Sequence, residues 1–348
     1  MQWRDDSLEA TWRSPDTPHL PAHHHPALLI ELAHARGIPE HRLLRHTGLF
    51  PEDMRRGEAM LSDRQYRRLI GNILEYDTGG ELALVWGRQS LPGHYGPPST
   101  QIHNAPNLAE ALNCLHHWRH QLSPLLTPLW WHNRQWCYLL WTTAGAGRRG
   151  PFLVPAAMAA VYGLARHRLA RSLDWHFLFA APRPTSPQPY EVNLGPTVRF
   201  GAGVDMVVLP VEDLYEPWPG RSQTAFTAAA HEAERVPALN GAGPTLPEVV
   251  YQSLAAHPET PAGLDDTAGA LGLSPSSLKR HLRDYDSRFQ ALYDEVRLHH
   301  SLYLHQVMGL SMEGIAERLS HGDRANFRRS FRRWTGLSPA QYQRLLPE

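Results

Sequence analysis

The chain has 348 residues. This length exceeds the usual size of a domain with a single hydrophobic core, so two domains are expected. It has 34 basic and 34 acidic residues and a formal net charge of zero, which excludes a uniformly cationic surface and confines any nucleic-acid-binding site to a local cluster. Its two cysteines, Cys114 and Cys137, form no CxxC pattern, so neither a zinc ribbon nor a disulfide framework is expected, and no metal or other cofactor is assigned.

The sequence predicts neither a membrane-spanning helix nor an export signal. The longest apolar run, residues 152–165, contains Pro155 and is shorter than the roughly 20 residues that a membrane helix requires. No apolar signal region opens the chain. We therefore expect a cytoplasmic protein without membrane contact.

Residues 1–25 combine prolines, charges and three consecutive histidines, His23, His24 and His25, without a helical period. This composition predicts a flexible arm. Consecutive histidines on a flexible segment do not form a preorganised metal site, so the role of the histidine-rich arm stays open.

Residues 26–235 are predicted to form an α+β domain for effector sensing or dimerisation, followed by an irregular linker at 236–246. Apolar runs bounded by turn residues predict a β-hairpin at 125–131 and 136–143 and further extended segments at 174–180 and 198–210. Helices are expected at 26–37, 39–48, 62–77 and 81–89, from residue 107, at 155–172 and near 221–235, with loops at 91–100 and up to residue 189.

A helix–turn–helix pattern occupies residues 265–282. Ala268 and Leu271 form the inner face of a first helix, and Gly272 can end that helix in the left-handed conformation. Ser274 is a good N-cap, and Pro275 suits the first position of a second helix.

The second helix of this unit has the properties of a recognition helix. Leu278 and Leu282 lie four residues apart and face the first helix. A helix with polar and cationic residues on its outer faces can enter a major groove about 12 Å wide. These outward residues are Ser276, Lys279, Arg280 and Arg283.

A second helix–turn–helix unit is predicted over residues 314–339, with Ile315, Ala316 and Leu319 inside its first helix and Phe327, Phe331 and Trp334 inside its second. Residues 320–344 contain six arginines and one acid, Asp323, a local charge of +5 that attracts phosphates. The arginines of its second helix are Arg324, Arg328, Arg329, Arg332 and Arg333. A charge run alone often marks a solvated helix face, but two similar units in tandem favour DNA binding.

A long helix over residues 289–307 joins the two units, and its apolar stripe consists of Phe289, Leu292, Val296, Tyr303 and Val307. Such a helix would fix the two recognition helices so that both can reach successive major-groove segments, which lie about 34 Å apart. The C-terminal domain, residues 247–348, is therefore predicted to be all-α, with two helix–turn–helix units joined by a long helix.

The segments LGLSPSSLKRHL, FQALYDEVRL, IAERL, NFRRSFRRWTGLSP and QYQR resemble the DNA-binding domain of the AraC/XylS family of transcription regulators. The resemblance implies base-reading roles for Ser276, Lys279 and Arg280, and for Arg324, Arg328 and Arg329. The chain departs from the family where Ser320-His321 stands in place of Gly-Phe and where Asp286 stands in place of Gly. Asp tolerates the left-handed conformation moderately well, and Gly322 can take part of the second turn.

Residues 27–220 resemble, less specifically, the ligand-binding domain of one branch of AraC-type regulators. The motifs are GLF-P, LALVWG, NAPNLAEAL and LGPTVRFGAGVDMVVL. This resemblance implies a small-molecule effector but assigns it no residues. The aromatic residues of the predicted hairpin are interpreted as core rather than as a pocket, and they are Trp130, Trp131, Trp136 and Trp141.

The sequence thus predicts a sequence-specific transcription regulator of the AraC type that binds double-stranded promoter DNA and is controlled by an effector or a partner. Homodimer formation and, for an activator, contact with RNA polymerase stay open. No catalytic motif such as GxSxG or HExxH is present, so an enzyme is not expected. The alternative is a DNA-repair enzyme or metal-dependent sensor carrying the same type of DNA-binding domain.

Overall fold

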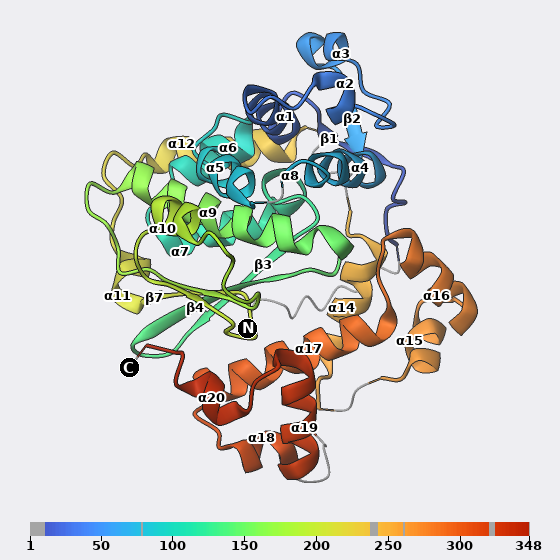
Figure 1. Cartoon of the computed structure of the whole chain (residues 1–348), viewed down its shortest axis with the longest axis vertical. Helices are drawn as coiled ribbons and strands as arrows, with labels where there is room; N and C mark the ends of the chain where they lie inside the picture. The colour runs from blue at the N-terminus through green and yellow to red at the C-terminus, as the bar shows by residue number, and fades with distance from the viewer. Residues whose placement is uncertain (1–10, 78, 237–242, 260–261, 320–323, 348) are drawn as a thin grey trace.

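The computed structural model describes residues 11–77, 79–236, 243–259, 262–319 and 324–347. It confirms the predicted fold class, an α+β N-terminal domain followed by a helical C-terminal domain (Figure 1). None of the helices in these ranges is both long and apolar enough to span a bilayer.

Short helices form the first part of the N-terminal domain, and side chains cap several of them. Ser62 Oγ accepts a hydrogen bond from Gln65 N at 3.3 Å, while the Ser62 amide donates to Gln65 Oε1 at 2.9 Å. This capping box fixes the start of the fourth helix. The helices are α1 (His25–Ala35), α2 (Glu40–Leu43), α3 (Pro51–Arg56), α4 (Asp63–Leu74), α5 (Glu81–Ser90), α6 (Pro97–His103), α7 (Leu108–His117) and α8 (Arg119–Leu122).

A five-stranded sheet forms the centre of the molecule, with strand order β3-β4-β7-β5-β6. The predicted hairpin is present as the antiparallel pair β3–β4, and only the pair β5–β6 is parallel within this sheet. The strands are β3 (Thr127–His132), β4 (Trp136–Thr142), β5 (His176–Phe179), β6 (Val198–Phe200) and β7 (Met206–Pro210). The helical segments within and after the sheet are η1 (Gly147–Arg149), α9 (Gly150–Arg168), α10 (Gln188–Leu194), α11 (Val211–Tyr215) and α12 (Gln223–Glu234).

Helix α9 crosses α5 at very short distance because both helices have a glycine at the contact. A Cβ atom at Gly87 would lie 2.1 Å from the Ala156 carbonyl oxygen, and one at Gly163 would lie 2.4 Å from the Arg88 carbonyl oxygen. Any larger residue at either position would push the two helices apart.

The C-terminal domain contains the two predicted helix–turn–helix units and an additional first helix. Its helices are α14 (Leu246–Ala256), α15 (Leu264–Ala270), α16 (Pro275–Asp284), α17 (Phe289–Gln306), α18 (Met312–Arg318), α19 (Arg324–Thr335) and α20 (Pro339–Gln343). Helix α17 is the predicted long connecting helix, and Leu292 and Val296 of its stripe are buried.

The sheet is covered on both faces, and the second cover is the C-terminal domain (Figure 1). Along β4, Cys137 and Leu139 belong to the core shared with α5 and α9, whereas Tyr138 and Leu140 belong to the core shared with the C-terminal helices. Successive strand residues point to opposite faces, so each face contributes to a different core. The two domains are therefore packed together through this sheet.

The prediction of a flexible arm at residues 1–25 is wrong for the part that the structure describes. Pro18–Pro21 forms strand β1, which pairs with β2 (Met60–Ser62), and Arg13 forms a bridge with Thr245. His25 is 1% exposed and begins α1. The pairing partners lie about 40 or more residues away, so no local period indicated them.

Two predicted loops also contain helices, since α6 begins within residues 91–100 and α10 lies at the end of the proline-rich segment. The helix predicted at 155–172 begins earlier, at Gly150, and Pro155 lies inside it. In both new helices a proline stands in the first turn, where its missing N–H costs no hydrogen bond.

Candidate DNA-binding surface

The first helix–turn–helix unit is built as the sequence predicts. Gly272 has φ 66°, in the left-handed region, directly after α15. Ser274 Oγ accepts a hydrogen bond from Ser277 N at 3.1 Å and thereby caps α16. Leu278 and Leu282 are fully buried, so the opposite faces of α16 point away from the core.

The candidate base-reading residues of α16 lie on its outer surface. Ser276, Lys279, Arg280 and Arg283 are all exposed. In the portion of the chain that the structure describes, the three cations form no ion pair. They are therefore available to DNA phosphates and base edges.

The second unit follows the same design. Ser311 Oγ accepts from Gly314 N at 3.2 Å to cap α18, and Ile315 and Phe327 are fully buried. Arg328, Arg329 and Arg332 are exposed on α19. The side chain of Arg324 and the whole of Ser320, His321 and Gly322 lie outside the described residues, so the prediction for the second turn stays untested.

Arg333 differs from the other arginines of α19. Its Nη2 atom forms an ion pair with Asp294 Oδ1 of α17 at 2.7 Å, and Trp334 Nε1 donates to the same oxygen at 3.0 Å. This contact directs Arg333 toward the connecting helix. Arg329, in contrast, donates to Asn326 on its own helix and remains exposed.

Asp286 takes the left-handed conformation that the sequence predicts at this position. It has φ 55°, so it takes the left-handed conformation for which the family uses glycine. Its carboxylate forms an ion pair with Arg149 of the N-terminal domain. The departure from glycine thus adds a contact between the domains.

A buried arginine that the sequence did not indicate connects the second unit to the segment that follows α14. Arg297 of α17 is 4% exposed; it donates to the Pro258 carbonyl oxygen at 3.1 Å and to the Leu319 carbonyl oxygen at the end of α18. Burial lowers the pKa of this guanidinium below its ordinary value. Arg297 fixes the first helix of the second unit to the end of α14.

Helix α16 is also connected to the N-terminal domain. Arg67 of α4 is 4% exposed and donates to the Asp284 carbonyl oxygen at 3.3 Å and to the Gly145 carbonyl oxygen at 3.3 Å. Its guanidinium lies 5.4 Å from the centre of the Tyr285 ring. A change in the N-terminal domain can therefore reach the C-terminal end of α16 through one side chain.

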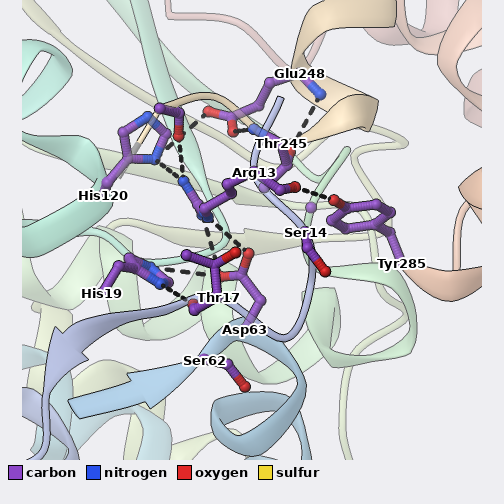
Figure 2. Close-up of polar contacts among 12 residues, drawn as sticks. Arg13, Ser14, Thr17, His19, Ser62, Asp63, His120, Thr245, Glu248 and Tyr285 are labelled. Carbon is purple, nitrogen blue, oxygen red and sulfur yellow. Dashed lines mark hydrogen bonds and ion pairs between the residues drawn. The ribbon is translucent and has the colours of Figure 1, made fainter. Parts of the chain in front are cut away.

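A cluster around Arg13 joins the start of the chain to both domains (Figure 2). Arg13 binds Asp63 through two hydrogen bonds, of 2.9 and 3.1 Å, and its Nη1 atom lies 3.1 Å from His120 Nδ1. The Tyr285 hydroxyl donates to the Arg13 carbonyl. Because Arg13 also donates to the Gly243 carbonyl, it holds the segment that leads into α14.

Glu248 of α14 completes this cluster. It accepts from Arg119 Nε at 3.0 Å, from Thr127 Oγ1 at 3.1 Å and from Thr245 N at 2.7 Å. The surrounding positive charges lower the pKa of its carboxyl despite burial. Glu248 thus remains charged and links the first C-terminal helix to the start of β3.

Two helix–turn–helix units on one connecting helix, each with exposed cations on its second helix, and a packed α+β domain define a two-domain DNA-binding regulator of the helix–turn–helix class. A family model described as the arabinose-binding domain of AraC transcription regulator, N-terminal, matches residues 37–218, more than half of the chain. A helix–turn–helix domain model matches residues 267–345. The chain therefore belongs to the AraC family of transcription regulators, as its sequence motifs predicted.

The relatives found by sequence match only part of the chain, whereas one solved structure matches most of it. The ornithine utilization regulator of Pseudomonas aeruginosa is 28% identical over 198 residues, which are 57% of this chain and 58% of that protein. The uncharacterized HTH-type transcriptional regulator Rv1395 of Mycobacterium tuberculosis is 33% identical over 79 residues, 23% of each chain. The crystal structure of transcriptional regulator CdpR from Pseudomonas aeruginosa is 18% identical, with a TM-score of 0.43, and the match covers 91% of this chain and 97% of that one.

Proposed function

We propose that this protein binds promoter DNA sequence-specifically through α16 and α19 and that an effector acting on its N-terminal domain controls this binding. The exposed cations of α16 carry the proposal, since they form no ion pair with the described residues and lie on a capped helix whose opposite face is buried. A recognition helix needs this arrangement to enter a major groove.

The side chains divide into two roles. Arg280 on α16 and Arg329 on α19 would donate to base edges, where arginine pairs bidentately with guanine. Arg283 and Arg332 would contact phosphates, which position the protein without reading sequence. The connecting helix α17 would present both helices to successive major-groove segments.

Effector control rests on the family of the N-terminal domain and on its contacts with α16 and α14. The relative from Pseudomonas aeruginosa is named as a regulator of ornithine utilization. We propose that this protein responds to a small metabolite. The relatives that match it are all named as regulators. A homodimer would place two such surfaces on one DNA molecule, and an activator would also contact RNA polymerase.

DNA selection tests the DNA-binding part of this proposal. Full-length protein is incubated with a random DNA pool, and bound sequences are enriched and read, with Arg280→Ala as the comparison. We expect one enriched motif for the native protein and relaxed preference at one or two base positions for the variant. Enrichment of no motif would refute sequence-specific binding.

A further inference from the structure

A cleft of about 650 Å³ lies between the two domains. Its size falls within the range of about 300–1,000 Å³ typical of small-molecule sites. Trp141 of β4 and Val204 of the loop between β6 and β7 line it from the N-terminal domain, and Leu292, Leu298 and Trp334 line it from α17 and α19. The cleft thus combines apolar walls from both domains with the polar groups described next.

Four carboxylates line this cleft, and two of them, Asp286 and Asp294, form ion pairs with Arg149 and Arg333. The other two are Asp205 of the N-terminal domain and Glu295 of the C-terminal domain. Glu295 Oε1 of α17 accepts from Thr143 N at 2.7 Å and from Thr143 Oγ1 at 3.0 Å. Asp205 Oδ1 accepts from Ala180 N at 2.8 Å. Within the described ranges, the second carboxylate oxygen of Glu295 and that of Asp205 have no hydrogen-bond or ion-pair partner.

One nearly buried side chain in the lining has an open nitrogen. His299 is 5% exposed; its Nδ1 atom lies 2.8 Å from the Tyr251 hydroxyl, and its Nε2 atom has no hydrogen-bond partner among the residues that the structure describes. Because His299 lines the cleft, a ligand bound there can supply a partner for this nitrogen.

The charges in the lining are arranged by depth. Arg148 and Arg288 are exposed, and in the described parts of the chain they form no ion pair. Asp205 and Glu295 are only partly exposed, and burial raises the pKa of both carboxyls. Asp294 is already paired with Arg333. A cation inside the cleft would therefore pair with Asp205 and Glu295, while an anion would pair with Arg148 and Arg288 at the rim.

We infer that this cleft binds an amino acid, with its protonated amine at Asp205 and Glu295 and its carboxylate toward Arg148 and Arg288. This inference rests on the proposed function, since such a ligand would be the effector. The aromatic ring of Trp334 in the lining suits an ammonium group, which aromatic rings attract. Because the ligand touches both domains, it binds the packed arrangement more tightly than a separated one and shifts the balance between them.

Isothermal titration calorimetry on the full-length protein tests the site. The probes are the common amino acids and L-ornithine, with 1,4-diaminobutane as an amine lacking a carboxylate and glutarate as a carboxylate lacking an amine. We expect at least one amino acid to bind, and glutarate not to bind. Absence of binding by every amino acid at millimolar concentration would overturn the inference.

The variants Glu295→Gln and Asp205→Asn test the placement, and Glu232→Gln on the exposed face of α12 is the control. Gln can still accept from Thr143, so the packing is kept while the charge is lost. We expect each cleft variant to weaken binding by about tenfold or more, the usual effect of losing a charge-assisted hydrogen bond, and the control to leave it unchanged. Equal affinities for native protein and both cleft variants would place the amine elsewhere.

DNA binding by the same protein samples separates the two proposals. A protein that binds a specific DNA sequence but no amino acid would refute the cleft assignment alone. A protein that binds an amino acid but no specific DNA would refute the proposed function. Arg148→Gln gives a second test of the ligand's orientation. It should weaken the binding of amino acids but not that of 1,4-diaminobutane, which has no carboxylate.

Discussion

Arg13 is 7% exposed, and the Asp63 side chain that it binds is 1% exposed. Removing one member of a buried pair leaves an uncompensated charge, so Arg13→Ala should lower the free energy of unfolding by about 3–5 kcal/mol. Arg64 and Asp16 form a pair of similar geometry whose side chains are 55% and 61% exposed. Arg64→Ala should therefore cost only about 0–1 kcal/mol.

Urea denaturation of both variants checks this contrast. The double variant Arg13→Ala/Asp63→Asn should recover part of the loss, because it also removes the stranded carboxylate. Similar losses for Arg13→Ala and Arg64→Ala would show that the cluster in Figure 2 does not hold the domains.

Arg280 is the residue with the most direct predicted role in base recognition. It is exposed on α16 and forms no ion pair within the described chain. Arg280→Ala should weaken specific binding by about 1–3 kcal/mol and leave non-specific binding largely unchanged. Titration of a specific and a scrambled duplex measures both, and equal losses on the two would make Arg280 a phosphate contact.

At this scale the sequence predicted local features better than distant pairs. The left-handed positions at Gly272 and Asp286 and the cap at Ser274 depend on neighbouring residues, and all three are present. The pairing of Arg13 with Asp63 and the role of Arg297 depend on chain segments that only the fold brings together. No local pattern could indicate them.

Helix α19 presents its arginines in two different environments. Arg332 is exposed, whereas Arg333 is held by Asp294 of α17. The salt dependence of DNA binding should reflect this, since each phosphate contact adds about one unit to the slope of log affinity against log salt. Arg332→Ala should reduce the slope by about one unit and Arg333→Ala by less. A larger reduction for Arg333→Ala would mean that its ion pair opens on DNA.

The contact between Thr143, which follows β4, and Glu295 of α17 should make stability pH-dependent. Burial raises the pKa of Glu295 from 4.5 to about 7. Between these values the folded state holds a proton that the unfolded state releases, so the free energy of unfolding should fall as pH rises, by at most about 1.4 kcal/mol per pH unit. Glu295→Gln should remove this part of the slope. Thermal unfolding from pH 4 to 8 compares the two proteins, and parallel curves would contradict the assignment.

The helices of the first helix–turn–helix unit were predictable because the Gly272 stop, the Ser274 cap and the spacing of Leu278 and Leu282 are local signals. Helix α14 was not predicted. For the sheet, the strands were predicted but their order and the cover on its second face were not. Both faces are apolar, so the alternation that usually distinguishes core from solvent is absent. Tyr138 and Leu140 point to one core and Cys137 and Leu139 to the other. Strand β1, helix α6 and helix α10 are short, so their periods are too brief to detect.

Over the whole molecule, the sheet forms a shared layer between the N-terminal and C-terminal domains (Figure 1). Gln306 of α17 shows how closely they join, since it accepts from Trp131 Nε1 at 2.8 Å and its amide donates to the Tyr342 hydroxyl at 2.9 Å. Sequence patterns assigned the two domains separately and could not indicate this contact. In the packed arrangement the cations of α16 and Arg328, Arg329 and Arg332 of α19 remain exposed.

Both helix–turn–helix units should read DNA in one protein, and DNA selection with two single variants checks this expectation. Native protein, Arg280→Ala and Arg329→Ala are each used to enrich sequences from the same random pool. We predict one motif with two parts about 10 base pairs apart, of which Arg280→Ala relaxes one part and Arg329→Ala the other. A motif with a single part, or relaxation of the same bases by both variants, would contradict this expectation.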